Sequence, residues 1–179
     1  KSHGRDGRLV RSYLAFVWGR LPRPKGSIDA RLGRSQANRT KIAVVRGEAG
    51  RSAITHYEVL ETFRGERPTG DVSLVRLVLE TGRTHQIRVH LAHIGHPVLG
   101  DAIYGSGFTT RLASLSHEAR ETAGALERQA LHAETLKFMH PKSGKKLSFT
   151  SALPEDLGNL FAVLHSPPKT TEKAKKKRL

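Results

Sequence analysis

The sequence predicts an α+β fold: a largely antiparallel mixed sheet flanked by a few helices. Segments with strand character outnumber helical ones, and short turns join several of them, which is typical of hairpins. Helical periodicity is confined to short stretches after residue 84. The expected strands cover residues 12–19, 41–46, 53–63, 72–80, 131–139 and 145–150.

Each expected strand has its own signal. Residues 12–19 (SYLAFVWG) are apolar on both alternating faces, which predicts a strand covered on both sides. Residues 72–80 place Val75, Leu77 and Leu79 on one face. Residues 41–46 and 53–63 are rich in β-branched and aromatic side chains, and residues 131–139 and 145–150 predict a hairpin. The intervening residues 21–26, 35–39, 47–52, 64–70 and 140–144 are expected to be turns or loops.

The clearest helix follows the fourth strand. Ile87, Leu91 and Ile94 are spaced as one narrow apolar stripe. Thr84 or Thr81 is expected to cap the start of this helix, and Gly95, followed by a proline, to end it. Residues 112–128 favour helix but are mostly polar, so we expect a surface helix or a mobile insertion there.

The charge is unevenly distributed. The chain of 179 residues carries 31 Lys and Arg against 16 Asp and Glu, a net charge of +15. Residues 1–51 and 169–179 hold the whole excess, while residues 52–168 balance to zero. Two cationic ends favour a polyanionic partner, although a solubilising surface gives the same composition. Residues 166–179 are expected to form a basic disordered tail.

Composition excludes several classes of protein. The absence of cysteine excludes disulfides and thiolate metal sites, and it is compatible with a cytoplasmic location. No apolar run is long enough to span a membrane, so no membrane partner is expected. Phosphate-binding glycine motifs do not follow any expected strand, which argues against a nucleotide cofactor.

The segment from residue 79 to 105 (LETGRTHQIRVHLAHIGHPVLGDAIYG) combines cations and hydrogen-bond donors with apolar sequence. On a helix, Arg88 lies at the edge of the apolar stripe, where it can reach from the core boundary into a cleft. Arg83 stands beside the free amides of the helix N-terminus, a combination that suits a phosphate. The alternative is an ordinary surface arginine over a capped helix.

Other chemistries have weaker support. His85, His90, His93 and His96 suggest zinc, but their spacing is not that of a helical zinc site. A zinc-dependent hydrolase therefore stays a third and weaker hypothesis, and no metal site is predicted. On sequence alone, Tyr13 is an ordinary buried aromatic residue.

The order of several motifs resembles that of the RluA-type RNA pseudouridine synthases. Residues 11–19 (RSYLAFVWG) resemble the basic-x-Tyr strand of that family. Residues 26–34 (GSIDARLGR) resemble its Gly-x-Ile-Asp loop, with Arg31 where the family usually has proline. The other matching segments, in the expected order, are residues 53–60, 73–105, 128–141 and 149–154.

The resemblance implies an enzyme that flips a uridine out of RNA and isomerises it without a cofactor or metal. It implies that Tyr13 is the active-site tyrosine and that Arg88 pairs with the catalytic aspartate. Arg83, His85, Gln86 and His90 would then line or support the RNA side of the cleft. The implied partner is ribosomal or transfer RNA, bound by a protein that we expect to be a monomer.

The family's nucleophile lies in an H-R-L-D segment that has no counterpart in this sequence. We therefore expect residues 1–165 to be the C-terminal portion of an incomplete pseudouridine synthase catalytic domain, inactive alone but part of an active enzyme. Arg88 would lack its carboxylate and should be exposed, disordered or paired with a substitute. Asp101, in Leu-Gly-Asp, is expected to be a turn or cap residue. The alternative is a non-catalytic RNA-binding module of the same fold.

Overall fold

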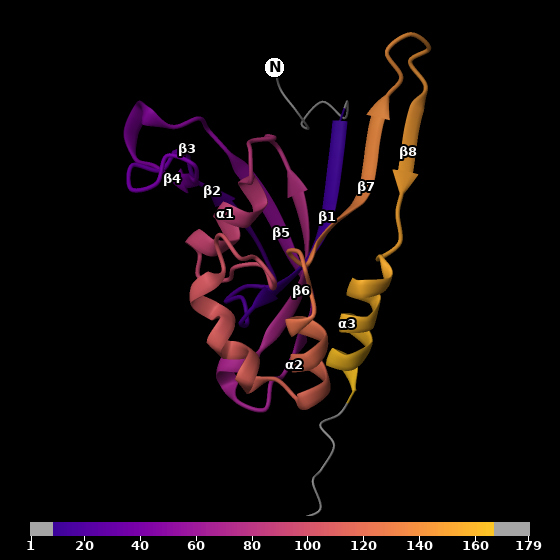
Figure 1. Ribbon diagram of the computed structural model, residues 1–179. Coiled ribbons are helices and arrows are strands. Elements are labelled where there is room, and N and C mark those ends of the chain that lie inside the picture. The colour runs from indigo at the N-terminus through magenta and orange to yellow at the C-terminus, as the bar shows by residue number, and fades with distance from the viewer. Residues whose placement is uncertain (1–8, 167–179) are drawn as a thin grey trace, which may run out of the picture.

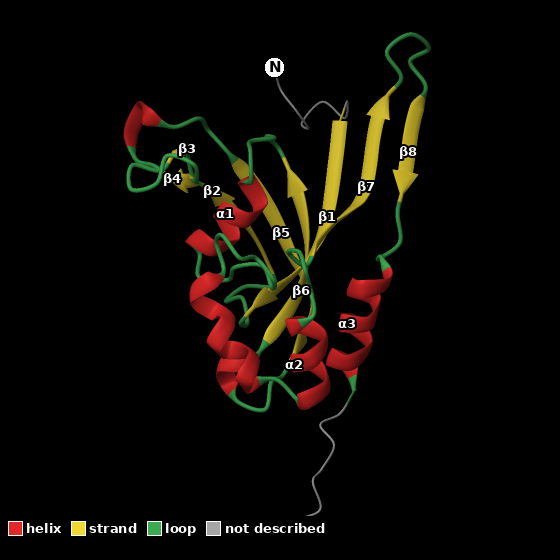
Figure 2. Cartoon of the chain, in the orientation of Figure 1, coloured by secondary structure: helices red, strands yellow, loops and turns green. Residues whose placement is uncertain are grey.

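An antiparallel six-stranded sheet with the order β2-β5-β6-β1-β7-β8 forms the centre of the molecule (Figure 1). The computed structural model describes residues 9–166. The sheet and its few helices confirm the predicted α+β class (Figure 2). The strands are β1 (Leu9–Trp18), β2 (Lys25–Asp29), β5 (Ile54–Phe63), β6 (Val72–Leu79), β7 (Leu131–Met139) and β8 (Lys146–Thr150).

A small second sheet stands beside the main one. It pairs β3 (Leu32–Arg34) with β4 (Ile42–Val44). The prediction of a loop over residues 26–34 was therefore wrong, because most of that segment lies in β2 and β3. Buried Leu32 explains the difference: it packs with Ala53 and Val89, and its backbone exchanges hydrogen bonds of 2.8 and 2.9 Å with Arg51.

Short helices surround the sheet. They are α1 (Gln86–His93), α2 (His117–Gly124) and α3 (Glu155–His165), with 3-10 turns η1 (Gly47–Ala49), η2 (Pro68–Gly70) and η3 (Ser106–Ser114). Instead of one helix over residues 112–128, the chain forms η3 and then α2. Ser116 breaks the run because its side chain accepts a hydrogen bond from the Ala119 amide and so starts a new helix.

Helix α3 was not predicted. Leu157 and Leu160 are fully buried, and the Phe161 ring meets the Phe63 ring edge-on with centroids 5.9 Å apart. Two carboxylates in its first turn suit the helix dipole.

Both faces of the sheet are covered. Val75, Leu77 and Leu79 share one face, as predicted, and Leu79 pairs with Thr55, which bonds to α1. Phe63 pairs with Val72, lies on the opposite face and packs against the Phe161 ring of α3. Because alternate residues of a strand point to opposite sides, the central strands are apolar almost throughout.

Helix α1 begins and ends at residues that adopt a left-handed conformation. His85 is the N-cap, with φ of 54° and no side-chain capping bond, so neither predicted threonine caps the helix. Gly95 follows the helix with φ of 84°, as its predicted role as a terminator requires.

Among the described residues, no helix is long and apolar enough to cross a membrane. The predicted basic tail lies, except for its first residue, outside the part of the chain that the structure describes.

Candidate functional site

Gln86 holds the loop between β6 and α1 in place. Its side-chain oxygen accepts hydrogen bonds from the Thr81 hydroxyl (2.8 Å) and the Arg83 amide (3.0 Å). Its side-chain nitrogen donates to the Ile54 carbonyl and the Thr55 hydroxyl, each at 3.0 Å. The side chain is buried and both of its polar atoms are satisfied, so Gln86 supports the site from within.

His90 continues the same buried chain. Its Nδ1 lies 2.9 Å from the Thr55 hydroxyl and its Nε2 lies 3.0 Å from the Ala30 carbonyl. Burial lowers the pKa of His90, because desolvation disfavours the imidazolium. The neutral ring then donates from Nε2 to the carbonyl, while the Thr55 hydroxyl donates to Nδ1 and accepts from Gln86.

The burial of Gln86 and His90 corrects the predicted single apolar stripe. Helix α1 packs against the main sheet on one side and against the β3–β4 sheet on another, where Val89 contacts the cluster around Leu32. A helix enclosed on two sides has more than one buried flank. Gln86 and His90 are both buried, so their position favours a supporting role.

Arg88 pairs with Asp101 inside the protein. Its Nε and Nη2 donate to the two carboxylate oxygens at 2.6 and 2.7 Å, and the Asp101 side chain is 0% exposed. Arg88 is thus paired with a carboxylate of this chain rather than exposed. Hydrogen bonding to Asp101 raises the pKa of Arg88.

Asp101 also forms the turn that was predicted for it. Its Oδ1 accepts hydrogen bonds from the amides of Ile103 and Tyr104, both at 3.0 Å. Burial alone would raise the pKa of Asp101, but hydrogen bonds from Arg88 and these two amides outweigh it and hold the pKa below its ordinary range. The carboxylate therefore stays ionised at neutral pH.

Tyr104 connects this turn to the start of α1. Its hydroxyl accepts a hydrogen bond from the Ile42 amide at 3.2 Å and lies 3.0 Å from Nδ1 of His85. Its ring lies 5.0 Å from the Arg88 guanidinium carbon. These contacts help to hold exposed His85 in its left-handed conformation, which costs energy for a residue with a side chain.

Tyr13 and Arg11 lie on the face of the sheet that α1 partly covers. Tyr13 pairs with Leu77, is half-buried and packs against the core. Arg11 lies two residues earlier on the same strand, and its Nε and Nη2 are buried without a hydrogen-bond partner in the described part of the chain. Gly82 makes this possible, because a Cβ at that position would overlap the Arg11 head group.

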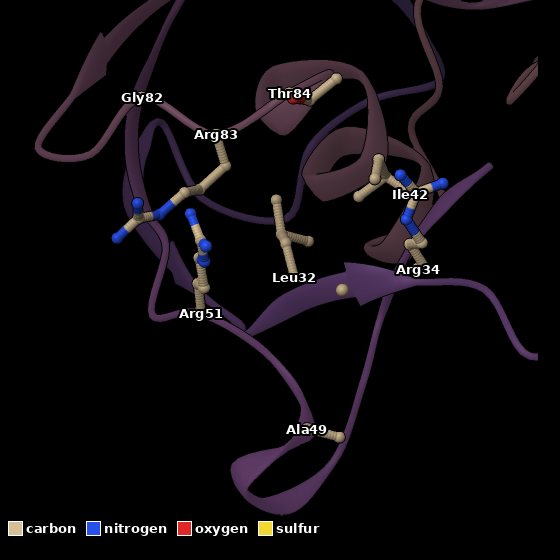
Figure 3. A pocket seen from close by; sticks show the side chains of 9 residues that line it. Leu32, Arg34, Ile42, Ala49, Arg51, Gly82, Arg83 and Thr84 are labelled. Carbon is tan, nitrogen blue, oxygen red and sulfur yellow. The ribbon is translucent and has the colours of Figure 1, made fainter. Parts of the chain in front are cut away.

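Arg83 is exposed, and its Nε donates to the Ser52 carbonyl at 3.2 Å. It lines a pocket of about 410 Å³ between the β3–β4 sheet and the loop before α1 (Figure 3). Arg34 and Arg51 line the same pocket.

The structure does not bring the histidines together as a metal site. Within residues 9–166, no group of three or more His, Asp or Glu side chains is placed to hold a metal ion. His90 bonds inward, and the Nδ1 of His96 bonds to the Trp18 carbonyl at 2.8 Å.

A family model described as RNA pseudouridylate synthase matches residues 3–93, about half of the chain. The chain belongs to the RNA pseudouridylate synthase family. This assignment confirms the resemblance seen in the sequence, and the matched residues include β1 with Tyr13 and all of α1.

Several curated synthases are similar to this chain. Ribosomal large subunit pseudouridine synthase D of Zymomonas mobilis is 42% identical over 159 residues, covering 89% of this chain and 46% of the relative. The enzyme of that name from Pseudomonas aeruginosa is 44% identical, covering 87% of this chain and 46% of the relative. An uncharacterized RNA pseudouridine synthase of Chlorobaculum parvum is 46% identical, covering 84% and 45%. The chain spans about half the length of the curated relatives it matches.

A solved structure shares the synthase fold. Human RNA Pseudouridylate Synthase Domain Containing 1 superimposes with a TM-score of 0.62 at 24% identity, covering 92% of this chain and 69% of that one. At this identity the likeness shows the fold alone.

Three features of the site escaped sequence analysis. The partnership of Arg88 with Asp101 joins residues thirteen positions apart across a loop, so no periodicity marks it. Thr55 lies in a strand with no sequence signal for its buried bonds. Arg11 was recognised only as a basic residue before Tyr13, and its burial depends on packing against Gly82.

Proposed function

We propose that this chain is part of an RNA pseudouridine synthase, which isomerises uridine in RNA to pseudouridine. The supporting observation is the family match across β1 and α1, which carry Tyr13 and the buried hydrogen-bond chain behind the loop. Because several relatives are named for the large ribosomal subunit, we take ribosomal RNA as the substrate. A monomeric cytoplasmic enzyme fits this assignment.

The site residues have different roles in this proposal. Tyr13 contacts the target uracil from the sheet and is the catalytic residue that this chain contributes. Arg88 is a positioning residue, because its pairing with Asp101 fixes the turn that carries Tyr104 and, through it, His85. Exposed Arg83 contacts RNA, while Gln86 and His90 hold the loop behind it. Arg88 is therefore not available to RNA, whereas Arg83 is.

Among the described residues, none of the contacts above places an acidic side chain beside Tyr13, where it could act as the nucleophile. Asp101 is already paired with Arg88. We therefore propose that residues 1–179 alone do not isomerise uridine, and that the full-length enzyme does. Isomerisation breaks the N1–C1′ bond and joins C5 to C1′, which releases the hydrogen on C5.

Tritium release from RNA labelled at uridine C5 tests both statements. The full-length protein should release tritium from ribosomal RNA, and a Tyr13→Phe variant of it should lose most of this activity. Turnover by residues 1–179 alone would contradict the proposed dependence on the rest of the enzyme. RNA binding by the full-length protein without any release would instead identify an RNA-binding module.

A further inference from the structure

The pocket between the β3–β4 sheet and the loop before α1 is positively charged. Arg34 comes from β3, Arg51 precedes β5, and Arg83 comes from the loop after β6. None of the described residues that line the pocket is acidic. Among the side chains that the structure describes, which do not include that of Glu48, none forms an ion pair with these three arginines. Their charges are therefore available to a ligand.

The arginines are arranged at the two ends of the pocket. In Figure 3 the head groups of Arg51 and Arg83 lie at one end, Arg34 lies at the other beside Ile42, and Leu32 stands between them. Arg83 and Arg34 each donate one hydrogen bond to a backbone carbonyl, to Ser52 at 3.2 Å and to Arg39 at 3.1 Å. A guanidinium has five N–H groups, so each keeps donors for an anion while its position is restrained.

A fourth guanidinium lies behind the wall of the pocket. Gly82 lines the pocket on one side, and the Arg11 head group lies against its other side. Arg11 is partly buried, and two of its nitrogens, Nε and Nη2, are buried with no hydrogen-bond partner among the described residues, which is costly for a cation. Its field is weakly screened there, so it strengthens the attraction of the pocket for an anion. Arg11 does not line the pocket, so it acts on a ligand there through its field alone.

We propose that this pocket binds the phosphodiester backbone of the RNA strand, with Arg34 and Arg51 as phosphate ligands. The inference rests on the proposed function, which supplies RNA as the polyanion. Cations at both ends suit two phosphates of one strand better than a single small anion. The described lining includes no aromatic side chain on which a base could stack, so the pocket holds the backbone and does not read sequence.

The test compares two double variants of residues 1–179 that lose the same charge. Arg34→Gln/Arg51→Gln alters the pocket. Arg64→Gln/Arg67→Gln alters two exposed arginines beyond the far end of β5, a ten-residue strand about 30 Å long. Affinity for a single-stranded RNA 12-mer is measured by fluorescence anisotropy between 50 and 250 mM KCl, and circular dichroism checks that each variant is folded.

The pocket variant should bind RNA at least about tenfold more weakly at low salt. Its slope of log K against log salt should be shallower by about 1.4, since each phosphate contact with a single strand contributes about 0.7. The control variant should keep most of the affinity and the slope. Arg34→Lys/Arg51→Lys should recover the slope. If the double glutamine variant does not fold, the single variants Arg34→Gln and Arg51→Gln decide the question, since each should make the slope shallower by about 0.7.

Equal effects in the pocket and control variants would overturn the proposal, because they would show only a general effect of charge. An unchanged slope in the pocket variant would overturn it as well. The proposal would also be overturned if inorganic phosphate or uridine monophosphate displaced the labelled RNA at the same concentration as unlabelled RNA does. Because the readout is binding, a full-length enzyme without isomerase activity would refute the proposed function and leave this result intact.

Discussion

The buried pair of Arg88 and Asp101 allows a quantitative prediction. In Asp101→Asn the side-chain oxygen still accepts the amides of Ile103 and Tyr104, but the new NH2 group faces the Arg88 donors. The substitution therefore removes the charge and one or both bonds to the guanidinium while the turn is kept. Removing one partner of a buried ion pair typically costs about 3–5 kcal/mol.

The chain contains a matched control. Arg128 and Asp156 form the same two-pronged pair, with both bonds at 2.8 Å, but each side chain is 39% exposed. The Arg88 and Asp101 side chains are 11% and 0% exposed. Exposed ion pairs contribute about 0–1 kcal/mol, so Asp156→Asn should cost no more than about 1 kcal/mol. The different expected costs of the two substitutions follow from the different burial of the two ion pairs.

Urea unfolding at pH 7 measures the free energy of unfolding of both variants. The lowered pKa of Asp101 adds a second signature. A carboxyl whose pKa is lower in the folded state contributes stability above its unfolded pKa, and this contribution is lost as the pH falls through the folded value. The difference between the wild type and Asp101→Asn should therefore shrink below about pH 4. A cost below about 1 kcal/mol at pH 7, equal to that of Asp156→Asn, would refute the reasoning.

Three further predictions concern stability. Gly95→Ala should destabilise the protein by about 1 kcal/mol, because Gly95 is left-handed, whereas Gly124→Ala at the end of α2 should be neutral or stabilising; equal effects in urea unfolding would contradict this. Thr55→Val should cost about 1–3 kcal/mol, since it leaves buried partners unsatisfied, while Thr122→Val, which removes only an exposed bond to the Glu118 carbonyl, should cost far less in the same measurement. Because the pKa of His90 is lowered in the folded state, the unfolded state binds the proton first as the pH falls, and the free energy of unfolding should decrease as the pH falls through about 6.5. The His90→Gln variant should lose less stability between pH 7.5 and 5.5. An equal loss in the variant and the wild type would exclude His90 as its source.

The sequence predicted the regular parts of the fold. Strands β1, β5, β6, β7 and β8 and helix α1 follow from apolar periodicity, which depends only on local spacing. The predicted strand over residues 41–46 contains β4, but β3 and its pairing with β4 were missed. β3 is three residues long and depends on Leu32 packing against α1, a contact remote in sequence, so it carries too little periodicity to be recognised.

The site was predictable in its location and less so in its contacts. The 79–105 segment carries Arg83, His85, Gln86, Arg88 and His90, and its part up to residue 93 lies within the family match. The partner of Arg88 and the buried environment of Arg11 could not be predicted, because both depend on where distant loops meet the sheet. Residue type and spacing indicate which side chains carry chemistry, whereas packing decides which of them remain free.

The four hydrogen bonds of Gln86 tie the arginine-bearing loop to β5. A movement of β5 would therefore move the Arg83 backbone with it. Under the proposed function, an RNA strand would bind a cation whose backbone is already held in place. Little binding free energy would then be spent on ordering the loop, and more would remain for flipping the nucleotide out of the RNA.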